Sequence, residues 1–228
     1  MNETKGSPYL IPLSIIVAGF FVAAGIFFSG KDIGAIKSNT GETPKENVSL
    51  RPVDKETDVI RGKGNPEIFV IEFSDFQCPY CKGFHKTMKE VLSNYPSVGW
   101  VYRHLPLTQI HPEAEPAALA SQCVAKLAGN DAFWVFADGL FESQANLGET
   151  LYVDLAKRAG ISESDFRTCL ASPEVRVKIS SDIKEAIDLG SRGTPSSFIV
   201  NKKGEILQTI SGALPFEQVK PIIEKALQ

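Results

Sequence analysis

Apolar and polar positions recur with two different periods along this chain, and their order predicts one sheet flanked by helices. Glu67–Phe73 is short and rich in β-branched and aromatic residues, which is typical of a buried strand. After Pro79, apolar residues recur at helical spacing as far as Tyr95, and Val98–Leu105 is again typical of a strand. The other predicted elements are helices in Glu113–Leu127, from Asp131, in Thr150–Ala159, Ser162–Leu170, Pro173–Gly190 and Phe216–Leu227, and a hairpin of Ser197–Val200 with Glu205–Ile210.

Capping residues mark several of the predicted helix ends. Asp131 can cap one helix, and Ser162 opens a Ser-Glu-Ser-Asp segment that resembles a capping box. Pro173 suits the start of another helix, and Gly190 suits its left-handed C-cap. The apolar residues between these two ends form one stripe: Val175, Ile179, Ile183, Ala186 and Ile187.

The N-terminal region contains one long apolar stretch. No charged residue occurs between Lys5 and Lys31, and Leu10–Phe28 is almost entirely apolar residues and glycine. About 20 such residues are enough to span a bilayer, whereas the apolar part of a cleaved signal peptide has about 7–15. The pattern therefore favours one uncleaved transmembrane helix within residues 1–30 over a cleaved signal. Lysines lie on both sides of it, so charge does not fix its orientation.

Composition divides the rest of the chain into two parts. Residues 31–58 are rich in polar residues and alternating charges and have no aromatic residue, so we expect a flexible tether. Residues 59–228 have a globular composition and are numerous enough for one domain with a core. The whole chain has 24 basic and 27 acidic residues, and this near balance gives no electrostatic basis for binding nucleic acid.

Two cysteines, Cys78 and Cys81, lie where the first predicted strand gives way to a helix. Pro79 suits the first helical position, so Cys78 is predicted to be the helix N-cap, at an exposed tip. Unpaired backbone N–H groups and the helix dipole favour a thiolate there, which is the attacking species in disulfide exchange. Cys81 continues the apolar stripe inward and is predicted to be the shielded resolving thiol. Half a zinc site and two unrelated cysteines are the alternatives, and a tetrahedral zinc site would need two further ligands.

Several segments together resemble the DsbA-like thiol–disulfide oxidoreductases. The segments that carry the resemblance are Phe73–Cys81, Phe133-Trp134 with Leu140–Gln144, Asp165–Leu170, and Gly193–Pro195 with the strand that follows. The resemblance implies a thioredoxin-like α/β fold with a helical insertion at about residues 112–190. It also implies that Cys78–Cys81 is a redox-active disulfide that works without another cofactor or a metal. Clients would be proteins with cysteines, and a quinone-linked membrane protein would reoxidise the enzyme.

The resemblance assigns roles to three further residues. Thr194–Pro195 would form a cis-prolyl loop opposite the cysteines and receive the client peptide, whereas an ordinary trans proline is the alternative. Glu72 would be a buried acid beneath the cysteines that accepts a proton from Cys81. Strand alternation supports this position, although a glutamate exposed at the sheet edge is the alternative.

The other two cysteines, Cys123 and Cys169, lie in the predicted insertion, and each is in helical register with apolar neighbours. A stable disulfide needs an oxidising compartment, so we place the domain outside the cytoplasm and expect a Cys123–Cys169 disulfide rather than two buried thiols. Histidines 85, 104 and 111 have no metal-ligand spacing and are predicted to be surface or strand-end residues.

The prediction for function is a membrane-anchored extracytoplasmic oxidoreductase, acting as a monomer and in the oxidising direction. The intervening residues Pro79 and Tyr80 would tune the potential. They depart from the Pro-His pair of the best-known oxidases and match glutaredoxins, so reductase and isomerase stay open as alternatives. A glutathione-linked glutaredoxin and a non-catalytic copper(I) carrier are the remaining alternatives, the latter because copper(I) accepts two thiolates.

Overall fold

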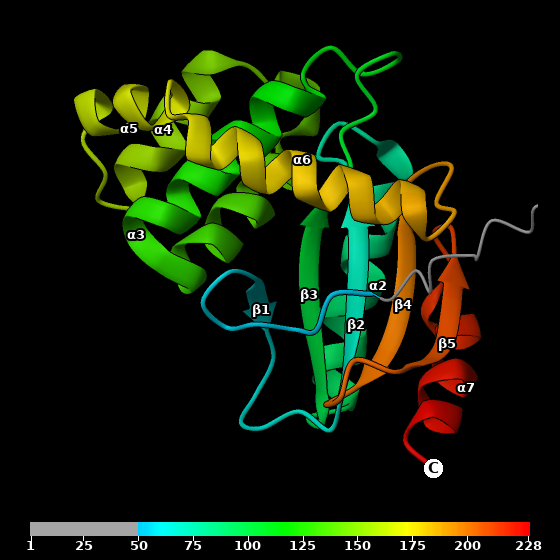
Figure 1. The fold of residues 1–228 in the computed structure, drawn as a ribbon. Helices are drawn as coiled ribbons and strands as arrows, with labels where there is room; N and C mark the ends of the chain where they lie inside the picture. The colour runs from blue at the N-terminus through cyan, green and yellow to red at the C-terminus, as the bar shows by residue number, and fades with distance from the viewer. Residues whose placement is uncertain (1–49) are drawn as a thin grey trace, which may run out of the picture. The chain divides into compact units, whose positions relative to one another are not determined.

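The computed structural model describes residues 50–228, which build a five-stranded sheet with helices on both faces (Figure 1). The strands are β1 (Val59–Arg61), β2 (Ile68–Ser74), β3 (Val98–His104), β4 (Ser196–Asn201) and β5 (Ile206–Ser211). The sheet order is β1-β3-β2-β4-β5, with β2 and β3 parallel and all other neighbours antiparallel. The three-residue strand β1 was not predicted, because so short a segment shows no period.

The helices are α2 (Pro79–Asn94), α3 (Ala114–Glu142), α4 (Glu149–Arg158), α5 (Glu163–Leu170), α6 (Pro173–Asp188) and α7 (Phe216–Ala226), with a 3₁₀ turn, η1 (Gln144–Asn146). Helices α3 to α6 lie between β3 and β4 in the chain and form the predicted insert. Their bounds agree closely with the prediction. The break near the middle of α3 falls at Gly129, whose φ of 85° is non-helical.

Local capping chemistry explains several of these ends. Ser162 caps α5, because its Oγ accepts a hydrogen bond from the Asp165 backbone N–H at 3.1 Å. Gly190 follows α6 with φ 80°, as predicted for a left-handed C-cap. The apolar stripe of α6 is only partly buried, because Ile187 is 61 % exposed. A residue at the edge of a stripe can leave the contact surface when the partner layer is narrower than the stripe.

The two faces of the sheet have separate cores. Ile68 and Val70 of β2 belong to the larger core, which includes α2, the insert and α7, while Phe69, Ile71 and Phe73 belong to the smaller core under α6. Figure 1 shows α6 crossing the near face of the sheet and α2 lying behind it. Strand alternation thus gives β2 two apolar faces, as expected for a central strand.

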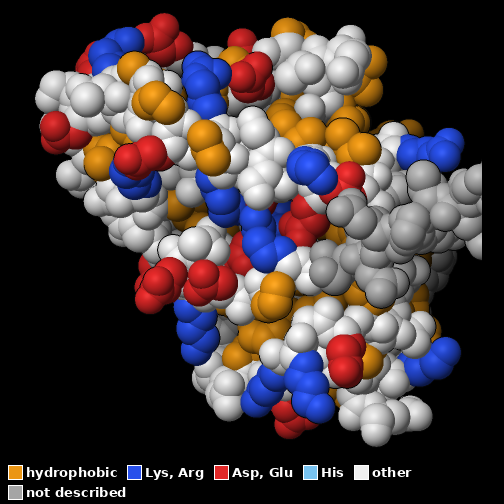
Figure 2. Space-filling model, viewed as in Figure 1, with side chains coloured by type: hydrophobic (Ala, Val, Ile, Leu, Met, Phe, Trp, Pro, Cys, Tyr) orange, Lys and Arg blue, Asp and Glu red, His pale blue; other side chains and the backbone are white. Residues whose placement is uncertain are grey.

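The last residues of the predicted tether are part of the domain. Leu50 is buried, and Arg51 forms an ion pair with Asp182 of α6 at 2.7 Å. Asp58 is also buried, and it pairs with Arg103 of β3 at 2.8 Å. Figure 2 shows acidic and basic side chains interleaved alongside α6 on this face. The tether prediction was therefore too long at its C-terminal end, because composition does not reveal charge partners that are distant in sequence.

No helix within residues 50–228 is long and apolar enough to cross a membrane. The predicted transmembrane helix at Leu10–Phe28 lies outside the described residues.

Candidate active site

Cys78 occupies the N-cap of α2, as predicted, with φ −71° and ψ 121°. A turn from the end of β2 positions it, with the Cys78 N–H donating to the Asp75 carbonyl at 3.1 Å. Pro79 then starts the helix, and the Lys82 N–H donates to the Cys78 carbonyl at 3.2 Å. Three features that can be read from the sequence, a strand end, a turn and a proline, therefore fix the position of the cysteine.

The cysteines differ less in exposure than predicted. Cys81 is fully buried, but Cys78 is only 3 % exposed, so the prediction of an exposed tip was wrong. The reason is the loop before β4, whose Thr194 carbonyl oxygen lies 3.5 Å from the Cys78 Sγ. A contact between residues 116 positions apart leaves no trace in the local pattern.

The acidities of the two thiols differ strongly. The pKa of Cys78 is lowered to about 5, chiefly by a hydrogen bond with the Cys81 thiol. Burial opposes this shift, while the Thr194 side chain and the backbone N–H groups of Tyr80 and Cys81 assist it. The pKa of Cys81 is raised well above its ordinary value, first by burial and then by Cys78 and Glu72. At neutral pH Cys78 is thus a thiolate and Cys81 a thiol, although the Cys78 side chain makes no regular capping hydrogen bond.

Glu72 is buried on the face of β2 that packs against α2, which rules out the alternative of an exposed glutamate. Its Oε2 accepts a hydrogen bond from the Trp100 Nε1–H at 2.9 Å. No lysine, arginine or histidine within residues 50–228 forms an ion pair with it. Burial is the largest cause that raises the pKa of Glu72 to about 7. Such a carboxyl group can gain or lose a proton near neutral pH.

The Thr194–Pro195 peptide bond is cis, as predicted, and leads directly into β4. The Pro195 carbonyl accepts a hydrogen bond from the Gly212 N–H at 3.2 Å, which ties this loop to the end of β5. The Thr194 hydroxyl is buried without a regular hydrogen-bond partner among the described residues. The loop therefore lies against Cys78, and its Thr194 side chain helps to stabilise the thiolate.

Gln144 holds the active-site turn from the side of the insert and was not predicted as a site residue. Its Nε2 donates to the Phe76 carbonyl at 2.8 Å and to the Cys78 carbonyl at 2.9 Å. The only signal in the sequence was its place at the end of the Leu140–Gln144 segment that supports the family resemblance. The contact spans 66 residues to Cys78, so no local period could reveal it.

Asp75 is a second unpredicted residue that supports the turn. It is buried, and its carboxylate accepts hydrogen bonds from the Gln77 N–H at 2.7 Å and the Leu107 N–H at 2.9 Å. His111 adds a contact of 2.7 Å from Nδ1. This histidine thus belongs to the support of the active-site turn.

The other two histidines are buried, so the prediction of a surface position was wrong for His85. His85 packs between the rings of Trp100 and Phe141 and lies 2.6 Å from the Asp138 carboxylate. His104 does end β3, as predicted, but burial lowers its pKa to about 4. Both fill the aromatic layer between sheet and insert, where burial lowers the pKa of each imidazole.

The second pair of cysteines forms a disulfide, Cys123–Cys169, which joins α3 to α5 within the insert. Cys78 and Cys81 are free thiols in this structure. Among residues 50–228, no group of three or more His, Cys, Asp or Glu side chains could hold a metal ion.

Comparisons with known proteins agree with this arrangement. A family model described as DSBA-like thioredoxin domain matches residues 69–224. Among solved structures, α-DsbA1 of Wolbachia pipientis has a TM-score of 0.65 at 24 % identity, covering 78 % of this chain and 93 % of that one. DsbA2 of Pseudomonas aeruginosa has a TM-score of 0.62 at 22 % identity, covering 77 % and 95 %. At these identities the likeness establishes the fold.

Curated relatives carry a different name. The chain is 37 % identical over 153 residues to the Na⁺/H⁺ antiporter NhaA 3 of Salinispora tropica, which covers 67 % of this chain and 23 % of that protein. It is 32 % identical over 167 residues to NhaA 1 of Mycolicibacterium gilvum, covering 71 % and 27 %. The chain thus spans about a quarter of the length of these relatives.

Proposed function

This chain belongs to the DSBA-like thioredoxin domain family, and from that membership and its cysteine geometry we propose that it introduces disulfides into client proteins outside the cytoplasm. Family membership makes it a thiol–disulfide oxidoreductase. The proposal adds the reacting residues, the direction and the compartment. The observation that carries it is the unequal acidity of Cys78 and Cys81.

The acidity of Cys78 supports the oxidising direction. A thiolate that is stabilised in the dithiol form lowers the free energy of the reduced enzyme, which makes the disulfide form a stronger oxidant. The pKa of about 5 for Cys78 therefore favours electron flow from client to enzyme. Pro79 and Tyr80 lie between the thiols, and Tyr80 is 70 % exposed. In this proposal they tune the potential and leave the approach to Cys78 open.

The reaction proceeds by two exchanges. A client thiolate attacks the Cys78 sulfur of the Cys78–Cys81 disulfide, and Cys81 leaves as a thiolate that takes a proton from Glu72. A second client thiolate then attacks the client sulfur of the mixed disulfide and releases Cys78 as a thiolate. The client loses two electrons and gains a disulfide, while the enzyme becomes the dithiol. Because Cys78 has a low pKa, it is a good leaving group in the second exchange.

Thr194 and Pro195 are proposed to bind the client next to the reacting sulfur. The Thr194 carbonyl lies 3.5 Å from the Cys78 Sγ, so a peptide bonded to that sulfur would lie beside the backbone of the loop. A membrane protein that passes electrons to quinone is proposed to reoxidise the dithiol. The domain is proposed to act as a monomer.

A membrane position is part of the proposal. The apolar stretch Leu10–Phe28 has the length of a membrane span. Similar domains also occur within longer proteins named as Na⁺/H⁺ antiporters.

Trapping of mixed disulfides tests the proposed roles of the cysteines. Cys81→Ala in the full-length chain should accumulate covalent adducts with client proteins, because the Cys78 thiolate can still attack a client disulfide, the reverse of the second exchange, and displace one client thiolate, while no Cys81 thiol is present to release the client by forming the Cys78–Cys81 disulfide. Cys78→Ala is the matched control and should give none. Equal adduct levels in the two variants would contradict the assignment.

The direction is tested on the wild-type full-length chain, in which both cysteines are present, by equilibration with glutathione. A reduction potential close to that of strongly oxidising DsbA, about −120 mV, supports the oxidising direction. A value near that of thioredoxin, about −270 mV, would identify a reductase instead.

A further inference from the structure

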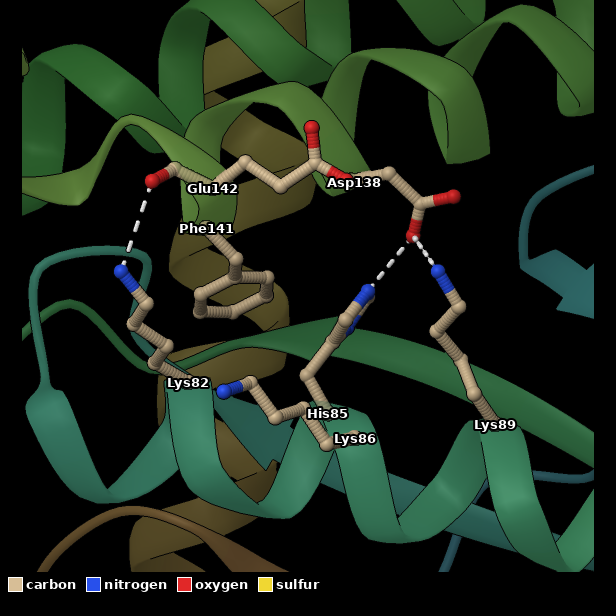
Figure 3. A pocket seen from close by; sticks show the side chains of 7 residues that line it. All are labelled: Lys82, His85, Lys86, Lys89, Asp138, Phe141 and Glu142. Atoms are coloured by element: carbon tan, nitrogen blue, oxygen red, sulfur yellow. Dashed lines mark hydrogen bonds and ion pairs between the residues drawn. The ribbon is translucent and has the colours of Figure 1, made fainter.

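A cavity of about 270 Å³ lies between α2 and the C-terminal part of α3, close to the active site. We call it the lysine cavity and define it by its lining residues: Lys82, His85, Lys86, Lys89, Asp138, Phe141 and Glu142. Figure 3 shows Phe141 between the two helices, with the lysines on the α2 side. The surface that lines the cavity is mainly apolar, so cationic groups surround an apolar floor.

The charges of the lysine cavity are unevenly paired. Asp138 is already bound by Arg61 at 2.7 Å and by His85 at 2.6 Å, and Lys89 lies 3.7 Å from it. Among the described residues, the Lys82 ammonium contacts a backbone carbonyl, that of Glu142, at 3.4 Å, and no carboxylate. Lys86 has no ion pair with any residue between 50 and 228. Within this part of the chain, the two ammonium groups therefore have no carboxylate partner.

The remaining acidic group does not neutralise these lysines. Glu142 uses its backbone oxygen to accept from Lys82, and Figure 3 shows its side chain directed along α3, away from Lys82. His85 is 4 % exposed, and its Nδ1 is buried without a hydrogen-bond partner among the described residues. The cavity thus offers cations that have no carboxylate partner among residues 50–228, together with an aromatic surface.

The position of the lysine cavity relates it to the reacting sulfur. Lys82 lies one helical turn after Cys78, and its N–H donates to the Cys78 carbonyl. At about 1.5 Å per residue, Lys82 and Lys86 lie roughly 6 and 12 Å along the helix from Cys78. An extended peptide advances about 3.3 Å per residue, so a client bonded to Cys78 reaches these lysines roughly two to four residues from its own cysteine.

From these observations we infer that the lysine cavity is a client subsite, which binds an acidic residue with an apolar neighbour two to four positions from the client cysteine. The carboxylate would pair with Lys82 and Lys86, and the apolar side chain would pack on Phe141. In the client sequence, these two residues and the residues that contact Thr194 lie on opposite sides of the client cysteine. The inference rests on the proposed function, since it presumes a mixed disulfide at Cys78.

Peptide kinetics with the oxidised full-length chain test the subsite. Two pairs of reduced peptides are used, each differing only in Glu or Gln three positions after or three positions before the cysteine, with leucine beside that residue. At low ionic strength at least one Glu peptide should react about three- to tenfold faster than its Gln partner, as two partly exposed ion pairs predict. The ratio should fall toward one in Lys82→Gln/Lys86→Gln, and for the wild type at high salt.

A matched control variant is Lys202→Gln/Lys203→Gln, which removes the same charge from the turn between β4 and β5. That turn follows Asn201, which pairs with Ile68 at the end of β2 opposite the active site. The Glu-to-Gln rate ratio should be the same in this control as in the wild type. Each ratio compares the same two peptides, so their intrinsic thiol reactivity cancels between variants.

Other outcomes would overturn the inference. A wild-type ratio near one in both peptide pairs would remove the subsite while leaving the proposed function intact, whereas no reaction with any peptide would contradict the proposed function itself. A ratio that Lys82→Gln/Lys86→Gln leaves unchanged would place the acidic preference elsewhere. Binding of phosphatidylglycerol vesicles that needs Lys82 and Lys86, without a peptide preference, would make the cavity a lipid site instead.

Discussion

Each face of the central sheet buries an ionisable side chain of a strand, Arg103 on one face and Glu72 on the other, but only Arg103 has ion-pair partners among residues 50–228. On the α6 face, Arg103 is fully buried, and its guanidinium binds Asp58 at 2.8 and 3.0 Å and Glu185 at 2.9 Å. On the α2 face, Glu72 is equally buried, yet its hydrogen-bond partner, Trp100, is neutral. The residues lie on adjacent strands, where Glu72 is opposite Tyr102 and Phe73 opposite Arg103.

The difference distinguishes a charge that stabilises the fold, on Arg103, from an acid that can exchange a proton, Glu72. A buried ion pair whose partners are all present stays charged over a wide pH range, and it holds together the elements that supply the partners. A buried carboxylate without a cation has no such compensation, so its protonated and ionised forms are close in free energy near neutral pH. The α2 face carries the cysteines, and its buried acid, Glu72, is the one that has no cationic partner among residues 50–228.

The largest effect is expected when the ion pairs of Arg103 on the α6 face are removed. Arg103→Met keeps much of the side-chain volume but leaves Asp58 and Glu185 without their guanidinium partner. Breaking a buried pair in this way costs about 3–5 kcal/mol of unfolding free energy. Urea unfolding at neutral pH measures the loss. Arg158→Met, at an exposed arginine of α4, is the control and should change stability by less than about 0.5 kcal/mol.

The same variant also tests whether the two faces are independent. The thiol acidity of Cys78 should stay low in folded Arg103→Met, because the groups that lower the pKa of this thiol lie on the other face. Thiolate absorbance against pH measures it. A rise of the Cys78 pKa toward the value of a free thiol would show that the α6 face also tunes the chemistry.

The second-largest effect is expected at Glu72, the buried acid of the α2 face. The pKa of Glu72 rises from an ordinary 4.5 to about 7 on folding, so this group destabilises the folded protein as pH rises between these values. In the oxidised protein, Glu72→Gln should therefore become more stable than the wild type as pH increases. The difference should level off above pH 7 at about 3 kcal/mol. Unfolding of both proteins across pH 4 to 9 measures it.

The difference between the two proteins isolates Glu72, because the other titrating groups are common to both. Oxidised protein is used because, in the dithiol, the charge of the Cys78 thiolate raises the pKa of Glu72 and would couple the two titrations. Glu90→Gln, at an exposed position of α2, should show no such pH dependence. A constant offset between Glu72→Gln and wild type would mean that Glu72 keeps an ordinary pKa.

The α2 face, which carries Glu72 and the cysteines, was largely predictable from sequence, whereas the ion pairs of the α6 face were not. The strand and Pro79 placed Cys78 at the start of α2, and alternation along β2 supported the inward position that the family resemblance gave to Glu72. The two signals from the residues themselves are local, because each depends on residues within one turn or one strand. The position of Thr194 opposite Cys78 came from the family resemblance, since no local pattern brings a residue 116 positions away to a thiol.

The ion pairs on the α6 face join residues that are distant in sequence. Arg103 takes its partners from 45 residues earlier and 82 residues later, and neither Asp58 nor Glu185 differs in local pattern from an ordinary surface acid. For the same reason the sequence marked the segment at Asp58 as a tether. The burial of His85 and the contact of Gln144 with Cys78 escaped prediction likewise, since both arise where the insert packs against the sheet domain. Periodicity predicts which elements form and which faces are apolar, but not which polar groups meet across them.

The smallest effect is expected at the neutral partner of Glu72. Trp100→Phe removes the indole N–H that donates to the Glu72 carboxylate, while most of the aromatic packing is kept. That hydrogen bond lowers the pKa of Glu72, so its loss should raise this pKa further, by roughly one unit, or about 1.4 kcal/mol. Carboxyl NMR of selectively labelled protein follows the titration. Trp134→Phe is a matched control, because its indole packs 4.6 Å from that of Trp100 but makes no hydrogen bond within residues 50–228. A similar shift in both variants would attribute the effect to loosened aromatic packing, and an unchanged titration in Trp100→Phe would show that the Trp100 hydrogen bond does not set the acidity of Glu72.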